Sequence, residues 1–327
     1  RFINLLEEYY EKDNLELEAI IYGIGSQYRL NYHNFVDTYQ RLVADPDMAE
    51  VKPRDALNIY FEPSSKYSNI RVTILGEGSI KNYCSTNSIK NIGYNVKFTK
   101  KENYFLGRKM GRVDINDYHV RLNLKTEEEL DPDSPIIKEL KADWNDLTKS
   151  FRRKQIHTFV TQIGMFTFDL SIVKRSNTIN EKMRIETVLK YNKQHLVVKP
   201  KDVKVSFYEW WTDIKKDKSN KVDVALQPSF YKRIENSNVL TNPEHFEIEI
   251  ELNKIGEIPD LTTLNQEGGS KKISNPRSQS NKKESQSSDD VSETKSVEKY
   301  IPNKAKIIQV FNKFIERIGM VLQTVQG

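Results

Sequence analysis

The segments that decide the fold are two short alternating strands, Leu15-Glu16-Leu17-Glu18-Ala19-Ile20-Ile21 and Phe246-Glu247-Ile248-Glu249-Ile250-Glu251-Leu252. Each alternates glutamate with apolar residues. Because successive side chains of a strand point to opposite faces, the apolar residues go to one side and the carboxylates to the other. Each segment is therefore predicted to have one apolar face and one acidic face.

The carboxylates on such a face lie close together. Successive ones are about 6.5 to 7 Å apart along a strand, and cross-strand neighbours approach to about 5 Å if the two strands pair. At an effective dielectric constant near 20, two full charges at that distance repel by roughly 3 kcal/mol. A cation among them would relieve this repulsion, and oxygen-only ligands suit Mg²⁺ or Mn²⁺.

The alternative is that these strands are half buried with their charges in water. Solvated strand faces usually mix lysine, threonine and glutamate, whereas these two are purely acidic. They also occur in a chain with 51 basic and 46 acidic residues. This contrast favours the cation site.

Composition limits the class of protein. With 327 residues, 37% of them hydrophobic, the chain can form one large domain or two ordinary ones. No apolar run is long enough to span a membrane and no signal peptide is recognisable, so a soluble protein is expected. The start at Arg1, without methionine, indicates a fragment. The single cysteine, Cys84, excludes an internal disulfide and fits a reducing compartment.

Further elements follow from periodicity. The predicted fold class is α+β, with a dominant antiparallel sheet that is curled or closed into a β-barrel with flanking helices. A turn-rich stretch is expected after residue 44, with Pro53, Pro63 and Ser64-Ser65, and a turn is expected at the glycine-containing segment 76–81. Helices are predicted over 2–12, 31–44, 134–146 and 178–191, and further strands over 69–75, 94–98, 119–125, 151–159, 165–174 and 203–208.

The polar faces of the other strands are mostly basic. Arg121 and Lys125 share one face, and Arg71 lies opposite an apolar face of its own strand. The run Arg152-Arg153-Lys154 places at least one cation inward in either register. If these faces line one barrel, its interior has an acidic wall opposite basic walls, which suits a metal ion together with a polyphosphate. For any single basic residue, a solvated surface charge is the alternative.

The C-terminal part changes in composition. Residues 266–299 are rich in Ser, Lys, Asn, Asp and Glu and are predicted to be a disordered insertion. After it, apolar residues at helical spacing predict a helix within 300–327 that docks on the barrel. The predicted domain of the tunnel therefore covers residues 1–265.

Taken in order, the first acidic strand, Phe151-Arg152-Arg153-Lys154, Phe168-Asp169-Leu170-Ser171-Ile172-Val173-Lys174 and the second acidic strand resemble the metal-dependent RNA 5′-triphosphatases of the tunnel family. The chain looks most like the amino-terminal domains of mRNA capping enzymes from large cytoplasmic DNA viruses. The resemblance covers roughly residues 15–252. It implies a triphosphate tunnel in which acidic strands hold one or two divalent ions and basic strands bind the triphosphate.

Site residues follow from the resemblance. The expected metal ligands or their supporting residues are Glu16, Glu18, Glu247, Glu249 and Glu251, with Mg²⁺ or Mn²⁺ as the cofactor. Asp169 is expected to orient the attacking water. The expected phosphate contacts are Arg71, Arg121, Lys125, Arg152, Lys154 and Lys174, although strict alternation from Asp169 sends Lys174 to the opposite face, so that its role requires a bulge.

The expected function is removal of the γ-phosphate from 5′-triphosphate RNA as the first step of cap formation, in the cytoplasm, a viral factory or a virion. Alternatives are a nucleoside or inorganic triphosphatase and a noncatalytic RNA-binding barrel. Capping enzymes commonly continue into a guanylyltransferase with a Lys-x-Asp-Gly motif, but Lys141-Ala142-Asp143-Trp144 and Lys221-Val222-Asp223-Val224 lack its glycine. A guanylyltransferase is therefore expected beyond this chain or on another chain, as a partner.

Overall fold

The structure is a computed structural model that describes residues 2–21, 30–90, 92–115, 120–177, 229–255, 258 and 302–326. Its elements run in the order α1 (Phe2–Glu11), β1 (Leu15–Ile21), α2 (Tyr32–Ala44), β2 (Met48–Phe61), β3 (Ile70–Leu75), α3 (Glu77–Thr86), η1 (Gly93–Asn95), β4 (Val96–Asn103), β5 (Phe105–Leu106), β6 (Lys109–Met110), β7 (Arg112–Ile115), β8 (Val120–Leu130), α4 (Pro135–Asp143), β9 (Lys149–Thr161), β10 (Phe166–Arg175), η3 (Ile234–Ser237), β11 (His245–Leu252) and α8 (Lys304–Gln326).

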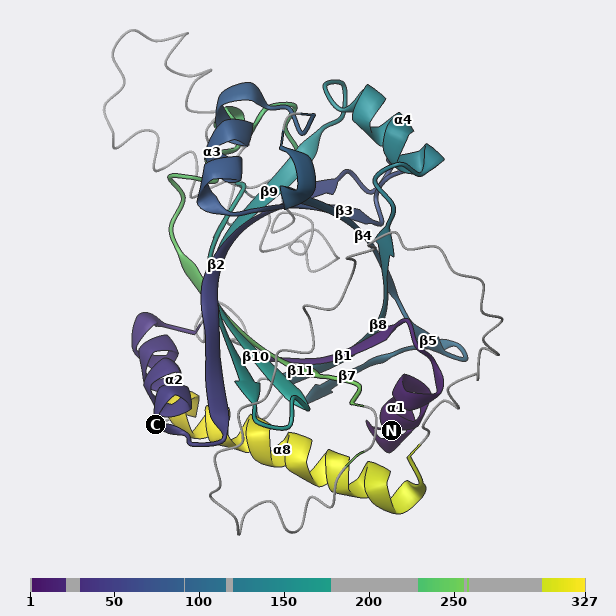
Figure 1. The fold of residues 1–327 in the computed structure, drawn as a ribbon, viewed down its shortest axis with the longest axis vertical. Helices are drawn as coiled ribbons and strands as arrows, with labels where there is room; N and C mark the ends of the chain where they lie inside the picture. The colour runs from purple at the N-terminus through teal and green to yellow at the C-terminus, as the bar shows by residue number, and fades with distance from the viewer. Residues whose placement is uncertain are drawn as a thin grey trace, which may run out of the picture.

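The sheet closes on itself. Its strand order is β1-β11-β10-β9-β2-β3-β4-β8-β7, and β1 also pairs with β8, so that eight antiparallel strands form a barrel with β7 attached to β8. Figure 1 looks down this barrel and shows the ring of strands. Closure leaves none of these eight strands as a free sheet edge. The predicted antiparallel barrel with flanking helices is thus confirmed.

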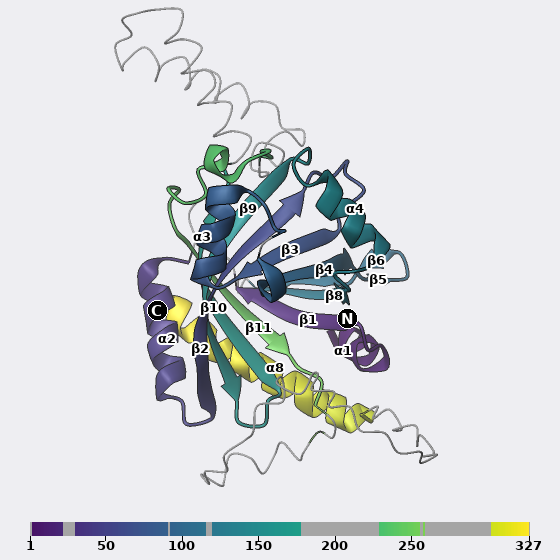
Figure 2. The same cartoon turned by 45° about the horizontal axis from the view of Figure 1, so that its top comes forward.

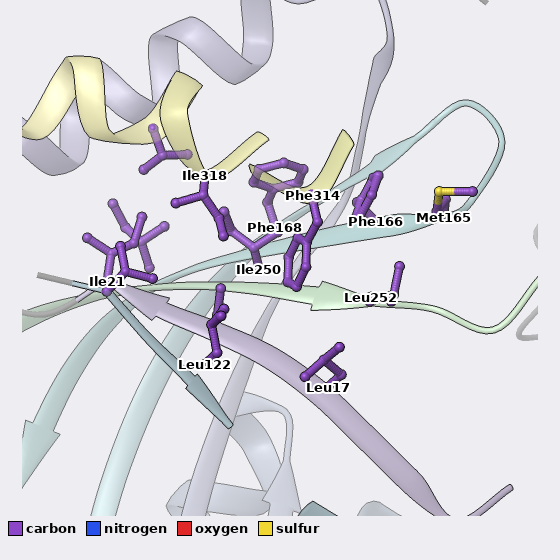
Figure 3. Close-up of a cluster of buried hydrophobic side chains, with 14 of the residues drawn as sticks. Leu17, Ile21, Leu122, Met165, Phe166, Phe168, Ile250, Leu252, Phe314 and Ile318 are labelled. Carbon is purple, nitrogen blue, oxygen red and sulfur yellow. The ribbon is translucent and has the colours of Figure 1, made fainter. Parts of the chain in front are cut away.

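The outer face of β1, β10 and β11 is apolar and buried. Leu17, Phe168, Ile250 and Leu252 belong to one cluster with Phe314 of α8, as Figure 3 shows. Phe314 stacks on Phe166, with ring centroids 5.6 Å apart. Alternation in the strands and the apolar stripe of the helix together explain why α8 covers this side of the barrel.

Polar contacts fix the position of α8. The side-chain amide of Asn34 in α2 donates to the carbonyl oxygens of Thr324 and Val325, at 3.3 and 3.2 Å. Arg317 forms ion pairs with Asp45, at 3.1 Å, and with Asp47. The predicted C-terminal helix therefore docks by an apolar face, by ion pairs of Arg317 in its middle and by hydrogen bonds at its last turn.

A second apolar cluster lies outside β2, β3 and β9, under α3 and α4. Tyr83, Trp144 and Phe151 are buried there, and the Trp144 indole donates to the Asn87 carbonyl at 2.8 Å. Figures 1 and 2 show α3 and α4 on the side of the barrel away from α8. Helices thus cover two opposite parts of the outer wall.

Two predicted turns are regular elements instead. Residues 52–61 belong to β2, because Pro53 lies at a bulge, where β2 has one extra residue opposite β9 and the missing N–H costs no ladder bond. Gly76, with φ of 83°, precedes helix α3 directly. This helix buries only Ile80 and Tyr83, so its apolar periodicity is too weak to be read from the sequence.

The other predicted elements within the described residues are present, with boundaries shifted by a few positions. The predicted helix over 178–191, the strand over 203–208 and the insertion over 266–299 lie outside the described residues. The domain boundaries at 265 and 299 stay predictions. In the part of the chain that the structure describes, no helix is long and apolar enough to cross a membrane.

Candidate active site in the barrel

The inner faces of the eight strands enclose a cavity of about 1070 Å³. Its wall is largely polar because the alternating strands turn their charged residues inward. Figures 1 and 2 show the strands that surround it. The charged residues that line it are Asp13, Glu16, Glu18, Arg54, Arg71, Lys97, Lys101, Lys125, Glu127, Glu129, Arg152, Lys154, Asp169, Glu249, Glu251 and Lys254.

The acidic strands lie side by side. β1 pairs with β11 in antiparallel register, with Glu18 directly opposite Glu251. On its other side β11 pairs with β10, where Glu249 lies opposite Asp169. Residues far apart in the chain thus form a continuous acidic surface inside the barrel, which we call the acidic floor (Glu16, Glu18, Asp169, Glu247, Glu249, Glu251).

Cations of β9 neutralise the β11 part of this floor. The Lys154 ammonium lies 3.4 Å from Glu247 and 3.6 Å from Glu249, and Arg152 forms an ion pair with Glu247. Burial acts to raise the pKa of Glu249, but Lys154 and Arg152 outweigh it and lower that pKa below its usual range. Glu249 is therefore held as an anion.

The β1 part of the floor is paired with β8. The Glu18 carboxylate forms an ion pair with Lys125 and accepts a hydrogen bond from the Asn123 amide at 3.1 Å. Only 7% of Glu18 is exposed. Because a buried carboxylate is costly unless it is paired, these two partners are what allow it to face the interior.

Glu16 shares its cation with a second carboxylate. The Lys101 ammonium lies 2.7 Å from Glu16 and also pairs with Glu127, which in turn lies 3.4 Å from Arg71. The pKa of Glu16 is raised to about 8. Burial is the largest cause; Lys101 acts to lower this pKa, and Glu127, Glu18 and Glu251 act to raise it. The pKa of Glu127 is lowered, chiefly because Lys101 outweighs burial. This part of the floor has more carboxylates than neighbouring cations.

Asp169 is held from two sides. Thr158 of β9 donates to one of its oxygens at 2.6 Å, and the Arg54 guanidinium donates to the other at 3.0 Å. Arg54 reaches the tunnel because of the bulge at Pro53: without the extra residue, alternation would send Arg54 outward. The bulge thus adds a cation beside the acidic floor.

Most of the predicted site residues face the cavity. Nine of them line it, namely Glu16, Glu18, Glu249, Glu251, Asp169, Arg71, Lys125, Arg152 and Lys154. Glu247 lies on the same face of β11 and contacts the cavity residues Arg152 and Lys154. Arg121 shares the inner face of β8 but pairs with Asp114 of β7 at 2.7 Å and does not line the cavity.

Lys174 is the exception. The pairing of β10 with β9 and with β11 shows no register shift, so Lys174 lies on the outer face, 3.6 Å from Glu244. The bulge that an inward Lys174 requires is absent from β10. The prediction that it contacts phosphate inside the tunnel is therefore wrong.

Seven charged residues that line the cavity are absent from the predicted site, and three of them, Lys101, Glu127 and Arg54, belong to the ion pairs described above. Lys101 and Glu127 continue the alternation of strands whose predicted ends, at 98 and 125, were too early. Extending the alternation by two or three residues would have found both. Arg54 had no such signal, because Pro53 made its strand look like a turn.

The residue types of the acidic floor fit a hard divalent cation, because such ions prefer carboxylate oxygens. Glu16 and Glu18 share one face of β1, and Glu18 lies opposite Glu251 of β11, so these three side chains are near neighbours. As the side chains lie, however, several carboxylates are turned toward lysines. Among the described residues, no three acidic, histidine or cysteine side chains converge closely enough to hold a metal ion.

Comparisons with known proteins find distant likeness only. No protein-family model and no curated protein matches the chain. Among solved structures, the RNA triphosphatase domain of the mimivirus mRNA capping enzyme is 15% identical with a TM-score of 0.43, covering 78% of this chain and 88% of that chain. The Pct1 RNA triphosphatase of S. pombe is 11% identical with a TM-score of 0.36, covering 77% of each chain. Likeness at this level does not bear on activity.

Proposed function

We propose that this chain removes the γ-phosphate of 5′-triphosphate RNA in a reaction that depends on Mg²⁺ or Mn²⁺. Water attacks the γ-phosphorus, the bond to the oxygen that bridges to the β-phosphorus breaks, and the products are 5′-diphosphate RNA and phosphate. The observation that carries the proposal is the closed tunnel, in which carboxylates of β1 and β11 face arginines and lysines of the other strands.

Binding of the triphosphate is assigned to the cations of the tunnel wall. Arg71, Lys125, Arg152 and Lys154 come from three strands that surround the cavity, and Lys101 comes from a fourth. Phosphoryl transfer needs chiefly positioning and neutralisation of charge on the phosphoryl oxygens. The guanidinium and ammonium groups of the tunnel are already held in place by carboxylates. They therefore need little reorganisation to position the triphosphate and to neutralise its charge.

Asp169 is assigned the orientation of the attacking water. Its two oxygens are fixed by Thr158 and Arg54, and it lies beside Glu249 on the floor. A carboxylate held in this way can accept a hydrogen bond from water without moving. Arg54 therefore acts as a positioning residue for Asp169.

The metal would be held by the floor carboxylates Glu16, Glu18, Glu249 and Glu251, whose oxygens are suitable ligands. When bound, a divalent cation supplies polarisation of the γ-phosphoryl group. It would also oppose the two causes that raise the pKa of Glu16, which are burial first and then repulsion by neighbouring carboxylates. Lysines that now pair with these carboxylates would then be available to phosphate oxygens.

The experiment is phosphate release from a 5′-triphosphate RNA with the full chain, in the presence of Mg²⁺, of Mn²⁺ or of a chelator. Release with either ion and none with the chelator is expected. ATP and tripolyphosphate are the matched substrates, because they carry the same phosphates without the RNA. Faster turnover of ATP or tripolyphosphate than of RNA would favour the nucleoside or inorganic triphosphatase. RNA binding without any phosphate release would favour the alternative of a noncatalytic RNA-binding barrel.

We further propose that GMP transfer belongs to a different domain or chain, which takes the diphosphate end as its substrate. Asp143 ends helix α4, and the Lys141 ammonium donates to the Pro132 carbonyl at 2.8 Å, outside the tunnel. Incubation with labelled GTP should give no lysyl-GMP adduct. A stable adduct on this chain would overturn this assignment.

A further inference from the structure

The β5–β6 hairpin projects from the wall of the barrel, as Figures 1 and 2 show. Phe105 pairs with Met110 and Leu106 with Lys109, and the turn between them is Gly107-Arg108. Gly107 has φ of 60° at the first turn position, which the tight turns of two-residue hairpins require. The sequence and the turn geometry therefore agree on a defined hairpin.

The base of this hairpin is fixed to the barrel. The Gly111 N–H donates to the Tyr104 carbonyl and the Gly111 carbonyl accepts from the Leu124 N–H, both at 2.6 Å. A Cβ at position 111 would lie 3.0 Å from the Tyr104 oxygen and 3.1 Å from the Leu124 Cβ. This close approach needs glycine, so the hairpin is anchored on β8.

The outward surface of the hairpin is apolar and basic. Phe105 is 53% exposed and Met110 is 38% exposed, on the face opposite Leu106, which packs against the core. Arg108 and Lys109 are exposed, and neither has an ion pair or hydrogen bond with any side chain that the structure describes. The tunnel arginines and lysines discussed above are instead held by carboxylates.

The hairpin continues directly from a wall of the tunnel. Lys101 of β4 lines the cavity, and Phe105 follows four residues later, at most about 14 Å along the chain. An RNA whose 5′ end lies in the tunnel must leave it over the surrounding surface. A span of this length corresponds to the first few nucleotides of a single strand.

We propose that the β5–β6 hairpin binds the single-stranded RNA that follows the 5′ end, with Arg108 and Lys109 on its phosphates and Phe105 stacked on a base. The inference rests on the proposed function for the position of the 5′ end. Free cations beside an exposed aromatic ring are the combination that binds single strands without sequence preference.

A protein partner fits this surface less well. Stable protein interfaces bury about 800 Å² on each partner around an apolar centre, whereas this hairpin exposes two apolar side chains between cations. The segment 104–112 contains no acidic residue; Arg112 at its end pairs with Asp114 at 2.6 Å, which leaves Arg108 and Lys109 as its unneutralised cations among the described residues. Its charge matches a polyanion.

The test is the affinity of the full chain for a fluorescent single-stranded RNA of roughly 12 nucleotides, measured by anisotropy at several salt concentrations. The RNA carries a 5′-hydroxyl in one series and a 5′-triphosphate in the other. The variants are Arg108→Ala with Lys109→Ala, and Phe105→Ala. The matched control removes two exposed lysines near α3 and η3, by Lys90→Ala with Lys232→Ala.

Loss of two phosphate contacts should lower the slope of log affinity against log salt by about 1.4, since each contact on single strands contributes about 0.7. Phe105→Ala should weaken binding at least about fivefold. The control variant should have the same RNA affinity and salt slope as the unaltered chain. All variants should have the same melting temperature as the unaltered chain, because the substituted side chains are exposed. Unchanged affinity and slope in both hairpin variants would overturn the proposal.

The two RNA series separate this inference from the proposed function. If the hairpin binds RNA, its variants weaken binding of the 5′-hydroxyl RNA as well, whether or not the chain releases phosphate. If the chain releases no phosphate but the hairpin effect is present, only the proposed function fails. A crosslink from 4-thiouridine near the 5′ end to residues 104–112 is expected, and crosslinks solely elsewhere would contradict the hairpin assignment.

Discussion

Strand β9 has a buried lysine on each face, and the pKa values of these two lysines shift in opposite directions. On the tunnel face, burial acts to lower the pKa of Lys154, but Glu249 and Glu247 outweigh it and that pKa is raised. On the outer face, the Lys149 ammonium donates to the carbonyl oxygens of Trp144 and Leu147, both at 2.7 Å. None of the described carboxylates lies within ion-pair distance of it, and burial lowers its pKa to about 8.

This difference indicates that the inner and outer faces of the barrel have different roles. The inner face gathers charges of both signs that neutralise one another and are ready to exchange partners with an ion and a phosphate. The outer face buries apolar side chains under α1, α2, α3, α4 and α8 and supplies the stability of the fold. Substitutions on the two faces should therefore affect different measurements.

The largest expected effect is on the acidic floor. Glu249→Ala and Glu251→Ala should each abolish phosphate release, at least about a thousandfold, because they remove charge from the site at which the cation and the phosphate meet. The fold should persist, because closure of the barrel does not depend on these side chains. Glu128→Ala, on the outer face of β8, is the matched control and should keep full activity. Retained phosphate release in both floor variants would contradict the assignment of Glu249 and Glu251 to the cation site.

The next effect is on the outer face. Phe314→Ala should lower the free energy of unfolding by about 3 to 5 kcal/mol, since it removes a fully buried ring that stacks on Phe166. Urea denaturation followed by circular dichroism measures it. The activity of each folded molecule should be unchanged. A loss of activity without a loss of stability would show that the two faces are not separate.

A smaller effect is expected at the β2 bulge. Arg54→Ala should lower kcat/KM for triphosphate RNA by roughly tenfold to a hundredfold, because Asp169 loses the guanidinium that fixes it. Arg153→Ala is the control, since Arg153 pairs with Asp55 on the outer face at 2.9 Å. Arg54→Lys should restore part of the activity and should shift the pH–rate profile less than Arg54→Ala does. Equal effects of Arg54→Ala and Arg153→Ala would contradict the role of the bulge.

The last effect concerns Lys149 and is seen only as a dependence of stability on pH. Its folded-state pKa of about 8 lies below the unfolded value of 10.5, so the unfolded chain binds more protons between these values. Stability should therefore rise with pH from about 8 to 10.5, with a slope from this group of at most about 1.4 kcal/mol per pH unit. The measurement is urea unfolding of the wild type and Lys149→Met at pH 7 to 10. The difference between the two should change only above about pH 8, and a constant difference contradicts the burial argument.

Local alternation was enough to predict much of the site. Glu16, Glu18, Glu249, Glu251 and Asp169 were placed on the correct faces because a strand has a period of two wherever it lies. Lys174 follows the same rule, because alternation alone places it on the outer face of β10 and the structure has it there. Arg121 faces inward as predicted, yet Asp114 of a neighbouring strand turns it aside, and a single strand holds no information about that partner.

What the sequence determined by itself was the two-faced character of each strand and the apolar stripe of the last helix, because both depend only on residues close together in the chain. The tertiary structure decided which strands are neighbours, which lysine neutralises which glutamate, and that a bulge turns Arg54 inward. These depend on strand register and barrel closure, which join residues more than a hundred positions apart, such as Glu18 and Glu251. Partners at that distance are chosen by packing of the whole barrel, so no local pattern records them.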